Sequence, residues 1–552
     1  MIYILAFIVL LGVLVLAHEL GHFLAARMLG VKAEAFSLGF GKILLKKKVG
    51  DTEYRLSMIP LGGYVKFYGD DESKEKPIPA EMTPYLFKTQ KVWKRALIVF
   101  AGPLCNFILA AFVFAIVYFI GEPNVATKLG YVEQGSIAWN SGLKQGDTIE
   151  MVNGQKVQTW SELDKKVSEQ DGVADLTVKR ETEILNIKVP LSDLIAKNRY
   201  GETEYREQIQ GIAPFKRSPL VGVSSDPGKI AFTSGIKTGD LVYKVKDKEI
   251  TTWDELETAL STTVGKIDII VKRVEKKGAT PEDIKIVVSV PKRNSSTASL
   301  GFYPAELFVS GFVNDKSPAL IAGIQKGDRL FSVNDKPVLS FQSLQQIVDL
   351  AGRNNEVLKI VVERSGKFLN FQIVPSVHNI KDDEGGQKDK RFLLGVETNF
   401  YPGPVEQTKV IVRNPIKLIW VSIEKTAFWI WITLVGLIKL ITGAVSFKAV
   451  GGPLMIGKVA GDSLMLGIVY FLRIMAVISI NLGVINLFPV PVLDGGHLVL
   501  FSIEALRRKP LKERHIEIAQ QVGFYLLIGL IVLSFYNDIV RFGAGLLGIG
   551  GK

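Results

Sequence analysis

Cysteine and histidine are scarce in this sequence of 552 residues, which contains one Cys and five His. A single Cys excludes a framework of disulfide bonds within the chain. The first basic residue is Arg27, so the positively charged start of a removable secretory signal is missing and we expect the first apolar run to be kept. The formal net charge is +12, but basic and aromatic residues do not cluster together as on a nucleic-acid-binding surface. We therefore expect no nucleic-acid partner.

Long apolar runs dominate what is present. Hydrophobic residues make up 47% of the chain and the mean hydropathy is +0.24, which indicates membrane-spanning segments mixed with soluble domains. About twenty apolar residues cross the hydrocarbon core of a bilayer, and four runs predict transmembrane helices: residues 2–26, 96–120, 468–488 and 522–535. The run 415–441 carries four charged residues. We expect it to be an amphipathic helix at the membrane surface, the alternative being a fifth span.

The loops predict the orientation of these spans. Residues 27–95 carry fourteen Lys or Arg against eight Asp or Glu, and residues 507–514 add five basic residues. Short basic loops tend to stay in the cytoplasm, so both segments are expected there. Both termini and residues 122–414 are then extracytoplasmic.

One pattern occurs three times in the extracytoplasmic region. Each copy reads Ala, three residues, Gly, three residues, Gly-Asp, and the Gly-Asp pairs are 93 and 88 residues apart: Gly146-Asp147, Gly239-Asp240 and Gly327-Asp328. An apolar strand, a turn and a short helix are expected after each pair. The copies closely resemble bacterial PDZ domains, which bind extended peptides by adding a strand beside a helix. Peptides or trimmed substrate ends are therefore candidate partners, the alternative being that a copy is only a spacer.

Two Gly-containing strings near the ends of the copies have an open role. Leu300-Gly301-Phe302 and Leu394-Gly395-Val396 could each form a carboxylate-binding loop or simply a strand that closes the domain. The sequence alone favours neither.

The first apolar run contains the motif His18-Glu19-Leu20-Gly21-His22. Residues four apart lie on one face of a helix, so the two imidazoles can share a zinc ion. Glu19 is then placed to reach a metal-bound water rather than the metal. A purely structural role is disfavoured because two His and a Glu are costly to bury inside a membrane span.

A catalytic zinc needs a third protein ligand. The best candidate is Asp494, which follows Pro489 and Pro491 and precedes two Gly residues. His497 and Glu504 are also allowed by their spacing, and Asp494 could instead be only a turn residue at a helix end.

The H-E-x-x-H motif in the first span and Leu493-Asp494-Gly495 near the end of a later span resemble the site-2 protease family of intramembrane metalloproteases. The repeats between the spans resemble its regulator-of-sigma-E protease subgroup, which usually has two PDZ domains rather than three. Further matching strings are Gly39-Phe40-Gly41, residues 59–66, Gly102-Pro103-x-x-Asn106 and Gly451-Gly452-Pro453. The resemblance implies that Asp494 is the third zinc ligand and that the protein lies in the bacterial inner membrane.

The sequence thus predicts an intramembrane zinc endopeptidase that cuts single-pass membrane proteins, with Glu19 activating the water. In the family it resembles, the substrates include anti-sigma factors and signal-peptide remnants. The competing hypothesis is a catalytically inactive membrane scaffold with a structural metal. A structural zinc usually has four protein ligands, whereas this chain offers three and a base.

Two groups of residues are expected to bind substrate. Residues 54–67 read as strands with a bend at Gly62-Gly63, followed by Tyr64, and their edge could pair with an unwound substrate. The side-chain amides of Asn481 and Asn486 can donate and accept hydrogen bonds. The alternatives are structural packing for the β region and interhelical contacts for the two Asn. Asn106 either lines the site or packs in the second span.

The expected fold is a polytopic α-helical membrane protein with about four transmembrane helices, a membrane-associated β region and three inserted PDZ-like α/β domains. The boundaries are 1–120 for the first two spans, 121–213, 214–303 and 304–405 for the PDZ-like domains, 406–463 for interfacial helices and 464–552 for the last two spans.

Overall fold

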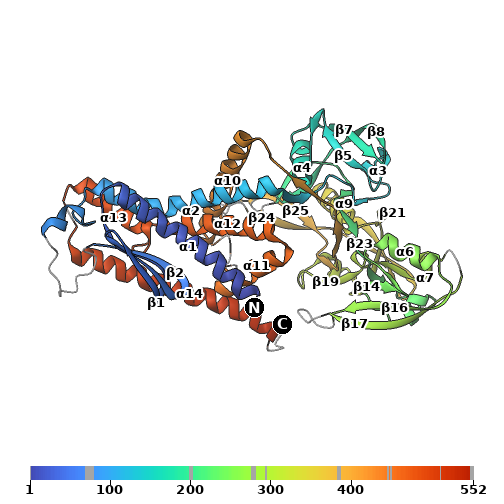
Figure 1. Ribbon diagram of the computed structural model, residues 1–552. Helices are drawn as coiled ribbons and strands as arrows, with labels where there is room; N and C mark the ends of the chain where they lie inside the picture. The colour runs from blue at the N-terminus through green and yellow to red at the C-terminus, as the bar shows by residue number, and fades with distance from the viewer. Residues whose placement is uncertain are drawn as a thin grey trace. The chain divides into compact units, whose positions relative to one another are not determined.

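The computed structural model describes residues 2–68, 80–197, 203–274, 281–292, 295–381, 387–443, 445, 447, 450–509 and 511–546. The chain forms two compact units, coloured mainly blue and orange to red for the first and green to yellow for the second (Figure 1). The first unit consists of Met1–Glu122 and Lys409–Gly551, and the second is Pro123–Thr408. Strands β3 (Glu122–Val125) and β28 (Gln407–Val410) lie where the chain passes between the units.

The first unit is built mainly from helices. They are α1 (Ile2–Met28), η1 (Ala80–Tyr85), α2 (Val92–Ile120), α10 (Pro415–Ile441), α11 (Pro453–Leu466), α12 (Ile468–Asn486), α13 (Asp494–Arg507) and α14 (Glu513–Leu546). In the described part of the chain, five helices are long and apolar enough to cross a membrane: α1, α2, α10, α12 and the Arg514–Phe542 part of α14. The protein is therefore a multi-pass membrane protein.

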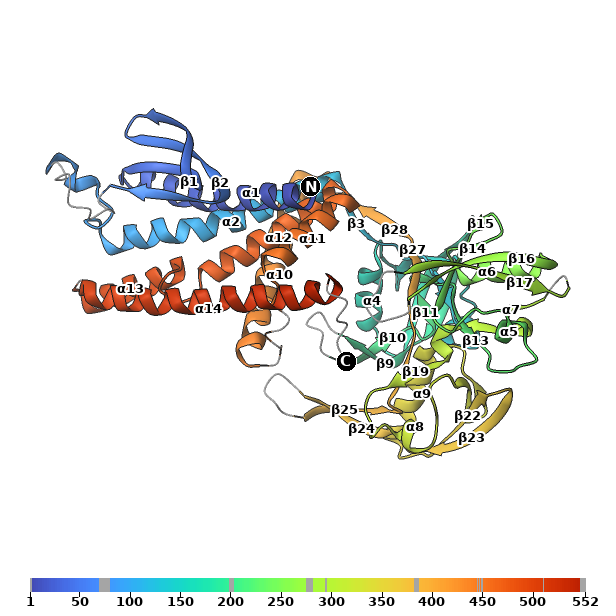
Figure 2. The same ribbon diagram turned by 90° about the horizontal axis from the view of Figure 1, so that it is seen from below.

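Helix α10 is the segment expected at the membrane surface. By length and composition it could also cross the membrane. In both views, however, it runs across the long axes of α1, α2 and α14 rather than along them (Figures 1 and 2). This arrangement favours an interfacial position, which stays a prediction.

The core of this unit is the contact between α1, α2, α11 and α12. Leu10 and Leu14 of α1 and Phe114 of α2 are fully buried in it. Polar groups also join the helices, because the Ser479 hydroxyl donates to the Asn106 carbonyl over 2.8 Å. Such contacts are favourable in an apolar medium, where the alternative is an unsatisfied polar group.

Charged residues in the apolar helices meet one buried carboxylate. Glu122, just beyond the end of α2, is 3% exposed and lies 3.5 Å from the Lys425 ammonium of α10 and 3.9 Å from the Arg473 guanidinium of α12. Lys425 and Arg473 thus have a buried carboxylate as their partner, which offsets the cost of placing a charge on an apolar helix.

The Gly451-Gly452-Pro453 string begins α11 and is capped by a distant carboxylate. Asp538 of α14 is fully buried and accepts hydrogen bonds from the backbone N–H groups of Gly452, Leu454 and Met455 at 2.9–3.1 Å. A side chain at Gly452 would meet the Asp538 carboxylate and the Ser534 backbone within 3.0 Å. Asp538 therefore satisfies the free N–H groups at the helix start and fixes α14 against α11.

The strand region predicted over residues 54–67 is present as β2 (Thr52–Phe67), and it pairs with a strand that was not predicted, β1 (Ala33–Val49). The first half of β1 pairs with both halves of β2, because Phe36 lies opposite both Tyr54 and Val65. Within these two strands, residues 63–67 are therefore an edge of the sheet. The strand turns at Gly62, whose φ of +137° is open mainly to glycine.

The second unit contains three copies of one arrangement. The first copy has β4 (Tyr131–Val132), α3 (Ile137–Asn140), β5 (Thr148–Val152), β6 (Gln155–Lys156), α4 (Trp160–Ser168), β7 (Val173–Arg180), β8 (Glu183–Pro190), β9 (Ser192–Lys197), β10 (Thr203–Gln208) and β11 (Ile212–Ala213). The second has β12 (Phe215–Arg217), β13 (Leu220–Val223), α5 (Ile230–Thr233), β14 (Asp240–Val245), β15 (Lys248–Glu249), α6 (Trp253–Ser261), β16 (Gly265–Arg273), β17 (Glu282–Val290), α7 (Thr297–Leu300) and β18 (Phe302–Pro304). The third has η2 (Ala305–Leu307), β19 (Val309–Phe312), α8 (Pro318–Ile321), β20 (Arg329–Val333), β21 (Lys336–Pro337), α9 (Phe341–Arg353), β22 (Leu358–Arg364), β23 (Lys367–Ile373), β24 (Ser376–Lys381), β25 (Gln387–Leu393) and β26 (Val396–Thr398), with β27 (Pro402–Val405) after it.

The strand order is the same in each copy. The sheets run β6-β5-β7-β8 and β21-β20-β22-β23 in the first and third, and β15, β14, β16 and β17 are paired in the same way in the second. The strand, turn and helix expected after each Gly-Asp pair are thus present. Each copy also has its own hydrophobic core.

The Asp of each Gly-Asp pair is buried and forms an ion pair with an Arg of a later strand, a contact called the Asp–Arg clamp below. Asp147 is 1% exposed, accepts from the Lys144 backbone N–H and receives two hydrogen bonds of 2.8 Å from Arg180, whose other contact is the Gly142 carbonyl. The same set recurs in the other copies with Asp240 and Arg273, and with Asp328 and Arg364. The repeated motif therefore joins the first turn to the end of a distant strand.

We expect Asp538→Ala to lower the thermal unfolding midpoint of the full-length protein in detergent. Three backbone N–H groups lose their acceptor, and an unsatisfied buried donor costs about 1–3 kcal/mol. Asp462→Ala is the control, because in the described part of the chain Asp462 of α11 accepts a hydrogen bond from the exposed Tyr3 hydroxyl and caps no helix start. Equal shifts for the two variants would contradict the capping role.

Candidate metal centre

Three side chains from two helices converge inside the first unit. His18 and His22 lie on one face of α1, and Asp494 is the first residue of α13. The Nε2 atoms of the two imidazoles are 3.2 Å apart, and they lie 3.2 Å and 3.6 Å from Oδ2 of Asp494. The fold thus brings together both ends of the chain at one point.

Two glycines allow α1 and α2 to approach each other closely here. A side chain at Gly102 of α2 would overlap the imidazole rings of His18 and His22. A side chain at Gly21 of α1 would overlap the backbone of Ala101. The Gly102-Pro103 string therefore makes room for the two His side chains.

Irregular backbone places Asp494 at the start of α13. Helix α12 ends at Asn486, and Pro489 and Pro491 prevent it from continuing. Side chains at Gly495 and Gly496 would overlap the backbone carbonyls of Leu487 and Val490. The two glycines therefore let α13 begin directly against the segment that precedes it.

The other two ligands allowed by spacing are placed differently. The Glu504 carboxylate pairs with the Arg95 guanidinium of α2 over 2.7 Å, which ties α13 to α2. His497 packs beside Phe501, with ring centroids 6.3 Å apart. Among the described residues, only His18, His22 and Asp494 form a group of three side chains able to hold a metal ion.

The spacing of the three atoms fits a zinc ion. Zinc binds imidazole nitrogen and carboxylate oxygen at about 2.0–2.2 Å, so two ligands of a tetrahedral site are about 3.3–3.5 Å apart. The observed separations are 3.2–3.6 Å. Oδ2 of Asp494 is also buried without a hydrogen-bond partner in the described part of the chain, as expected for an atom reserved for a cation.

The other ring nitrogens fix which atoms can bind the metal. Nδ1 of His22 lies 2.9 Å from the Ile98 carbonyl, which can only accept, so Nδ1 donates and Nε2 keeps its lone pair. Nδ1 of His18 lies 3.2 Å from the Asn106 carboxamide, whose oxygen is buried without a partner. Turning that carboxamide satisfies its oxygen and gives His18 the same tautomer. Three acceptor atoms then face one another, and a cation between them removes their repulsion.

Glu19 lies beside this group and contacts the sheet. Its Oε2 accepts a hydrogen bond of 3.1 Å from the backbone N–H of Val65 on the edge strand. Gly63 of the same strand comes so close to Glu19 that an added Cβ would lie 3.4 Å from its Cγ. The helix that carries the candidate base is therefore in direct contact with the β region.

The predicted substrate-binding residues are divided between two places. Asn486 and Gly63 are at the site, since the Asn486 amide nitrogen lies 3.4 Å from Nε2 of His18. Gly62 packs against the Phe40 ring, and Tyr64 stacks on the same ring. Asn481 instead accepts a hydrogen bond of 2.7 Å from Thr433 of α10, which is the interhelical alternative. A role of these residues in binding substrate stays a prediction.

Sequence reasoning missed Ile98 and Val65, which contact the site through backbone groups. A backbone carbonyl or N–H is present at every position, so its residue type carries no signal. Asn106 could have been identified as a histidine partner, because a polar side chain in an apolar span needs one.

We expect Asn106→Leu to weaken zinc binding by about 10–100-fold, the usual effect of losing a side chain that orients a metal ligand. Affinity is measured by competition with a chelator in detergent. Asn481→Leu is the matched control, because it removes an amide whose hydrogen bond is with Thr433 of α10 rather than with a His residue. Unchanged zinc affinity in the Asn106 variant would overturn its assigned role.

Comparison with known proteins agrees with this geometry. The model of peptidase family M50 matches residues 6–530. The chain is 30% identical over 542 residues to the regulator of sigma E protease of Haemophilus influenzae and to the regulator of sigma-E protease RseP of Escherichia coli, with 97% of this chain and 98% of each relative covered. It is 31% identical over 543 residues to a putative zinc metalloprotease of Neisseria meningitidis, with the same coverage. A solved PDZ domain protein from Parabacteroides distasonis matches at 10% identity and a TM-score of 0.12, with 46% of this chain and 94% of that chain covered. The near-complete family match means that this chain belongs to peptidase family M50, the site-2 proteases, and is a zinc metalloprotease.

Proposed function

We propose that this protein is an intramembrane endopeptidase that cuts single-pass membrane proteins within their spanning segment. The observation that carries the proposal is the convergence of His18, His22 and Asp494 next to Glu19, inside a bundle of apolar helices. A scaffold with a structural metal would need a fourth protein ligand, and the described residues offer none. A carboxylate base beside three ligands favours hydrolysis.

Each residue of the site has a separate role in the proposed reaction. His18, His22 and Asp494 hold the zinc, with Ile98 and Asn106 orienting the two rings. Zinc, when bound, acidifies a water molecule and polarises the scissile carbonyl. Glu19 takes the proton from the attacking water and delivers it to the leaving nitrogen.

The substrate helix must unwind before it can be cut, because its scissile carbonyl is bonded within the helix. Unwound backbone in a membrane needs new partners. Residues 63–67 supply them, since this edge of the sheet lies beside Glu19 and its Val65 N–H points away from β1. Strand addition there gives the substrate backbone its hydrogen bonds.

The contact between Glu19 and Val65 links substrate binding to the base. Without substrate, the carboxylate accepts the Val65 N–H. A substrate strand that pairs with this edge takes the same N–H and releases Glu19 for proton transfer. The base is thus available when a strand is in place.

The three repeats of the second unit are PDZ domains on the extracytoplasmic side of the bacterial inner membrane. Their shared order of elements, in which a helix follows the short second strand of the hairpin in each copy, supports the assignment. The basic loops of the first unit support the orientation. The names of the relatives from Haemophilus influenzae and Escherichia coli point to regulation of a sigma factor. The family resemblance implies an anti-sigma factor or a signal-peptide remnant as the type of substrate.

The central test is cleavage of a tagged single-span substrate in membranes. We expect Glu19→Gln to lower cleavage by about 10²–10⁴-fold while zinc stays at about one per chain, because the base is lost and the ligands are not. Metal analysis of both proteins is the control. Equal cleavage by both proteins would remove Glu19 from the mechanism, and zinc binding without any cleavage by either would favour the scaffold.

The edge strand has its own test. We expect Val65→Pro to reduce cleavage by about tenfold or more, since it removes the N–H that pairs with substrate. Proline is tolerated on the free side of an edge strand, so the sheet and the zinc content should be unchanged. Val65→Ala keeps the N–H and should cleave normally. Normal cleavage by the Pro variant would exclude strand addition at this position.

A further inference from the structure

The three repeats differ in the loop that precedes their last strand. In each copy a glycine with positive φ starts this strand: Gly211, Gly301 and Gly395, with φ of 90°, 92° and 74°. Successive N–H groups around a left-handed glycine form a concave site that favours an anion. Whether these N–H groups are free decides whether a copy can hold a carboxylate.

In the second repeat the N–H groups of the loop are already used. Helix α7 ends at this loop, and the Leu300 N–H donates to the Ser296 carbonyl while the Gly301 N–H donates to the Ala298 carbonyl. The Thr297 hydroxyl lies 3.5 Å from the Glu257 carboxylate of α6. Helix α7 therefore contacts the helix that would form the other wall of a groove.

In the third repeat the same N–H groups are free. Among the described residues, neither the Leu394 nor the Gly395 N–H has a hydrogen-bond partner, whereas both carbonyls are bonded, to Ala319 and Val313. Strand β26 pairs with β19 on one side, and no described strand pairs with its other side. This loop thus combines two free donors with a free strand edge.

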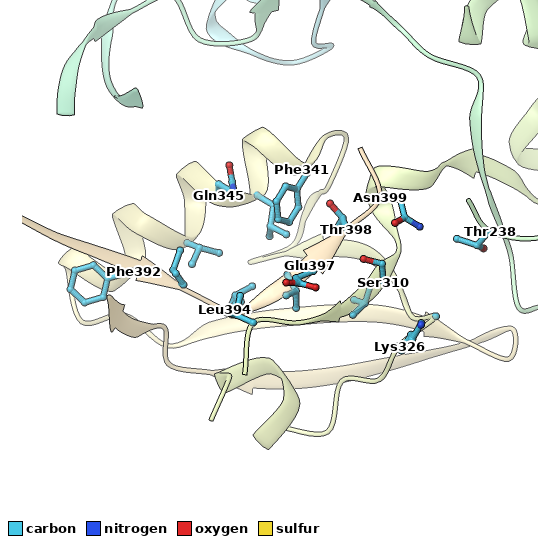
Figure 3. Close-up of a pocket in the computed structure, with 18 of the residues that line it drawn as sticks. Thr238, Ser310, Lys326, Phe341, Gln345, Phe392, Leu394, Glu397, Thr398 and Asn399 are labelled. Atoms are coloured by element: carbon cyan, nitrogen blue, oxygen red, sulfur yellow. The ribbon is translucent and has the colours of Figure 1, made fainter. Parts of the chain in front are cut away.

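A groove of about 1000 Å³ lies beside that free edge and is bordered at one end by Thr238 and Val274 of the second repeat. Figure 3 shows α9, with Phe341 and Gln345, on one side and the segment carrying Leu394, Glu397 and Thr398 on the other. Leu344 and Val348 of α9 make the wall near the loop apolar. Such a wall suits an apolar side chain at the end of an extended peptide.

The first repeat has free N–H groups like the third repeat, but its groove is smaller. The Gln210 and Gly211 N–H groups are also without a partner in the described part of the chain. Its groove, however, has a volume of about 220 Å³ and is bordered by Gln342 from the third repeat. The Gln210 side chain is held by Gln346 of α9 over 2.6 Å. This groove is smaller than most ligand sites.

We infer that the third repeat is the peptide-binding copy, that it holds an extended peptide by its free C-terminal carboxylate and an apolar last residue, and that the second repeat binds no such end. The carboxylate accepts from the Leu394 and Gly395 N–H groups, and the peptide backbone pairs with the free edge of β26. In an extended peptide, the last residue and the residue two places before it point to the same face, so both side chains contact α9. The inference rests on the proposed PDZ assignment but not on protease activity.

The test is peptide binding to the full-length protein in detergent, carrying Glu19→Gln so that no peptide is cut. The probe is a fluorescent pool of decapeptides with Val, Leu or Ile at the last position and mixed residues before it. Fluorescence anisotropy compares this pool with the same pool amidated at its C-terminus. We expect amidation to weaken binding by about tenfold or more. Equal binding of the acid and the amide, or no binding of either, would overturn the inference.

Three matched variants locate the site. Gln345, Glu257 and Asp164 are each the fifth residue of their helices α9, α6 and α4. We expect Gln345→Trp to fill the groove and reduce binding about tenfold or more, and Glu257→Trp and Asp164→Trp to change it by less than about twofold. Loss of binding in either of the latter two, with Gln345→Trp unchanged, would assign the peptide to another copy. The comparison of acid with amide on the parent protein stands even if a variant fails to fold.

Discussion

The convergence of three hydrogen-bond acceptors in an apolar bundle is the constraint on which the rest of the structure depends. Nε2 of His18, Nε2 of His22 and Oδ2 of Asp494 lie within 3.2–3.6 Å of one another. Without a cation, that arrangement combines lone-pair repulsion with desolvation. The contacts around these three atoms hold them in this arrangement. Gly102 makes room for the rings, Asn106 and the Ile98 carbonyl orient them, and two further glycines let α13 start at the carboxylate.

The same helix also couples the metal centre to the sheet. Glu19 follows His18 directly, so its side chain points to another side of α1 and meets the edge strand rather than the metal ligands. In the proposed mechanism, the hydrogen bond between Glu19 and the edge strand connects two events, the unwinding of the substrate and the proton transfer that follows it.

The three copies in the second unit share one sequence pattern but differ in which backbone N–H groups are bonded. All three copies use the same clamp, in which a buried Asp and an Arg hold the first turn against a strand. They differ in one short segment. In the second copy it winds into α7 and uses its own N–H groups, whereas in the first and third copies a strand, β10 or β25, leads into the loop and leaves those groups free. The buried Asp–Arg contact is thus common to all three copies, whereas the proposed capacity to bind a peptide depends on a few backbone hydrogen bonds.

The sequence by itself determined the features that depend on residue type and local spacing. These are the apolar runs, the threefold repeat, and the pair of His residues, since hydropathy and helical period are properties of a short segment. It also supplied Asp494, but only through a family resemblance, because spacing alone equally allowed His497 and Glu504. Tertiary structure places Glu504 against Arg95 and Asp494 against the imidazoles, which favours Asp494 as the third ligand. It also separated Asn486 from Asn481 and assigned roles to the backbone groups of Ile98, Val65 and Leu394. Backbone N–H and carbonyl groups are identical at nearly every position, so only the packing of distant segments determines which of them remain free to act.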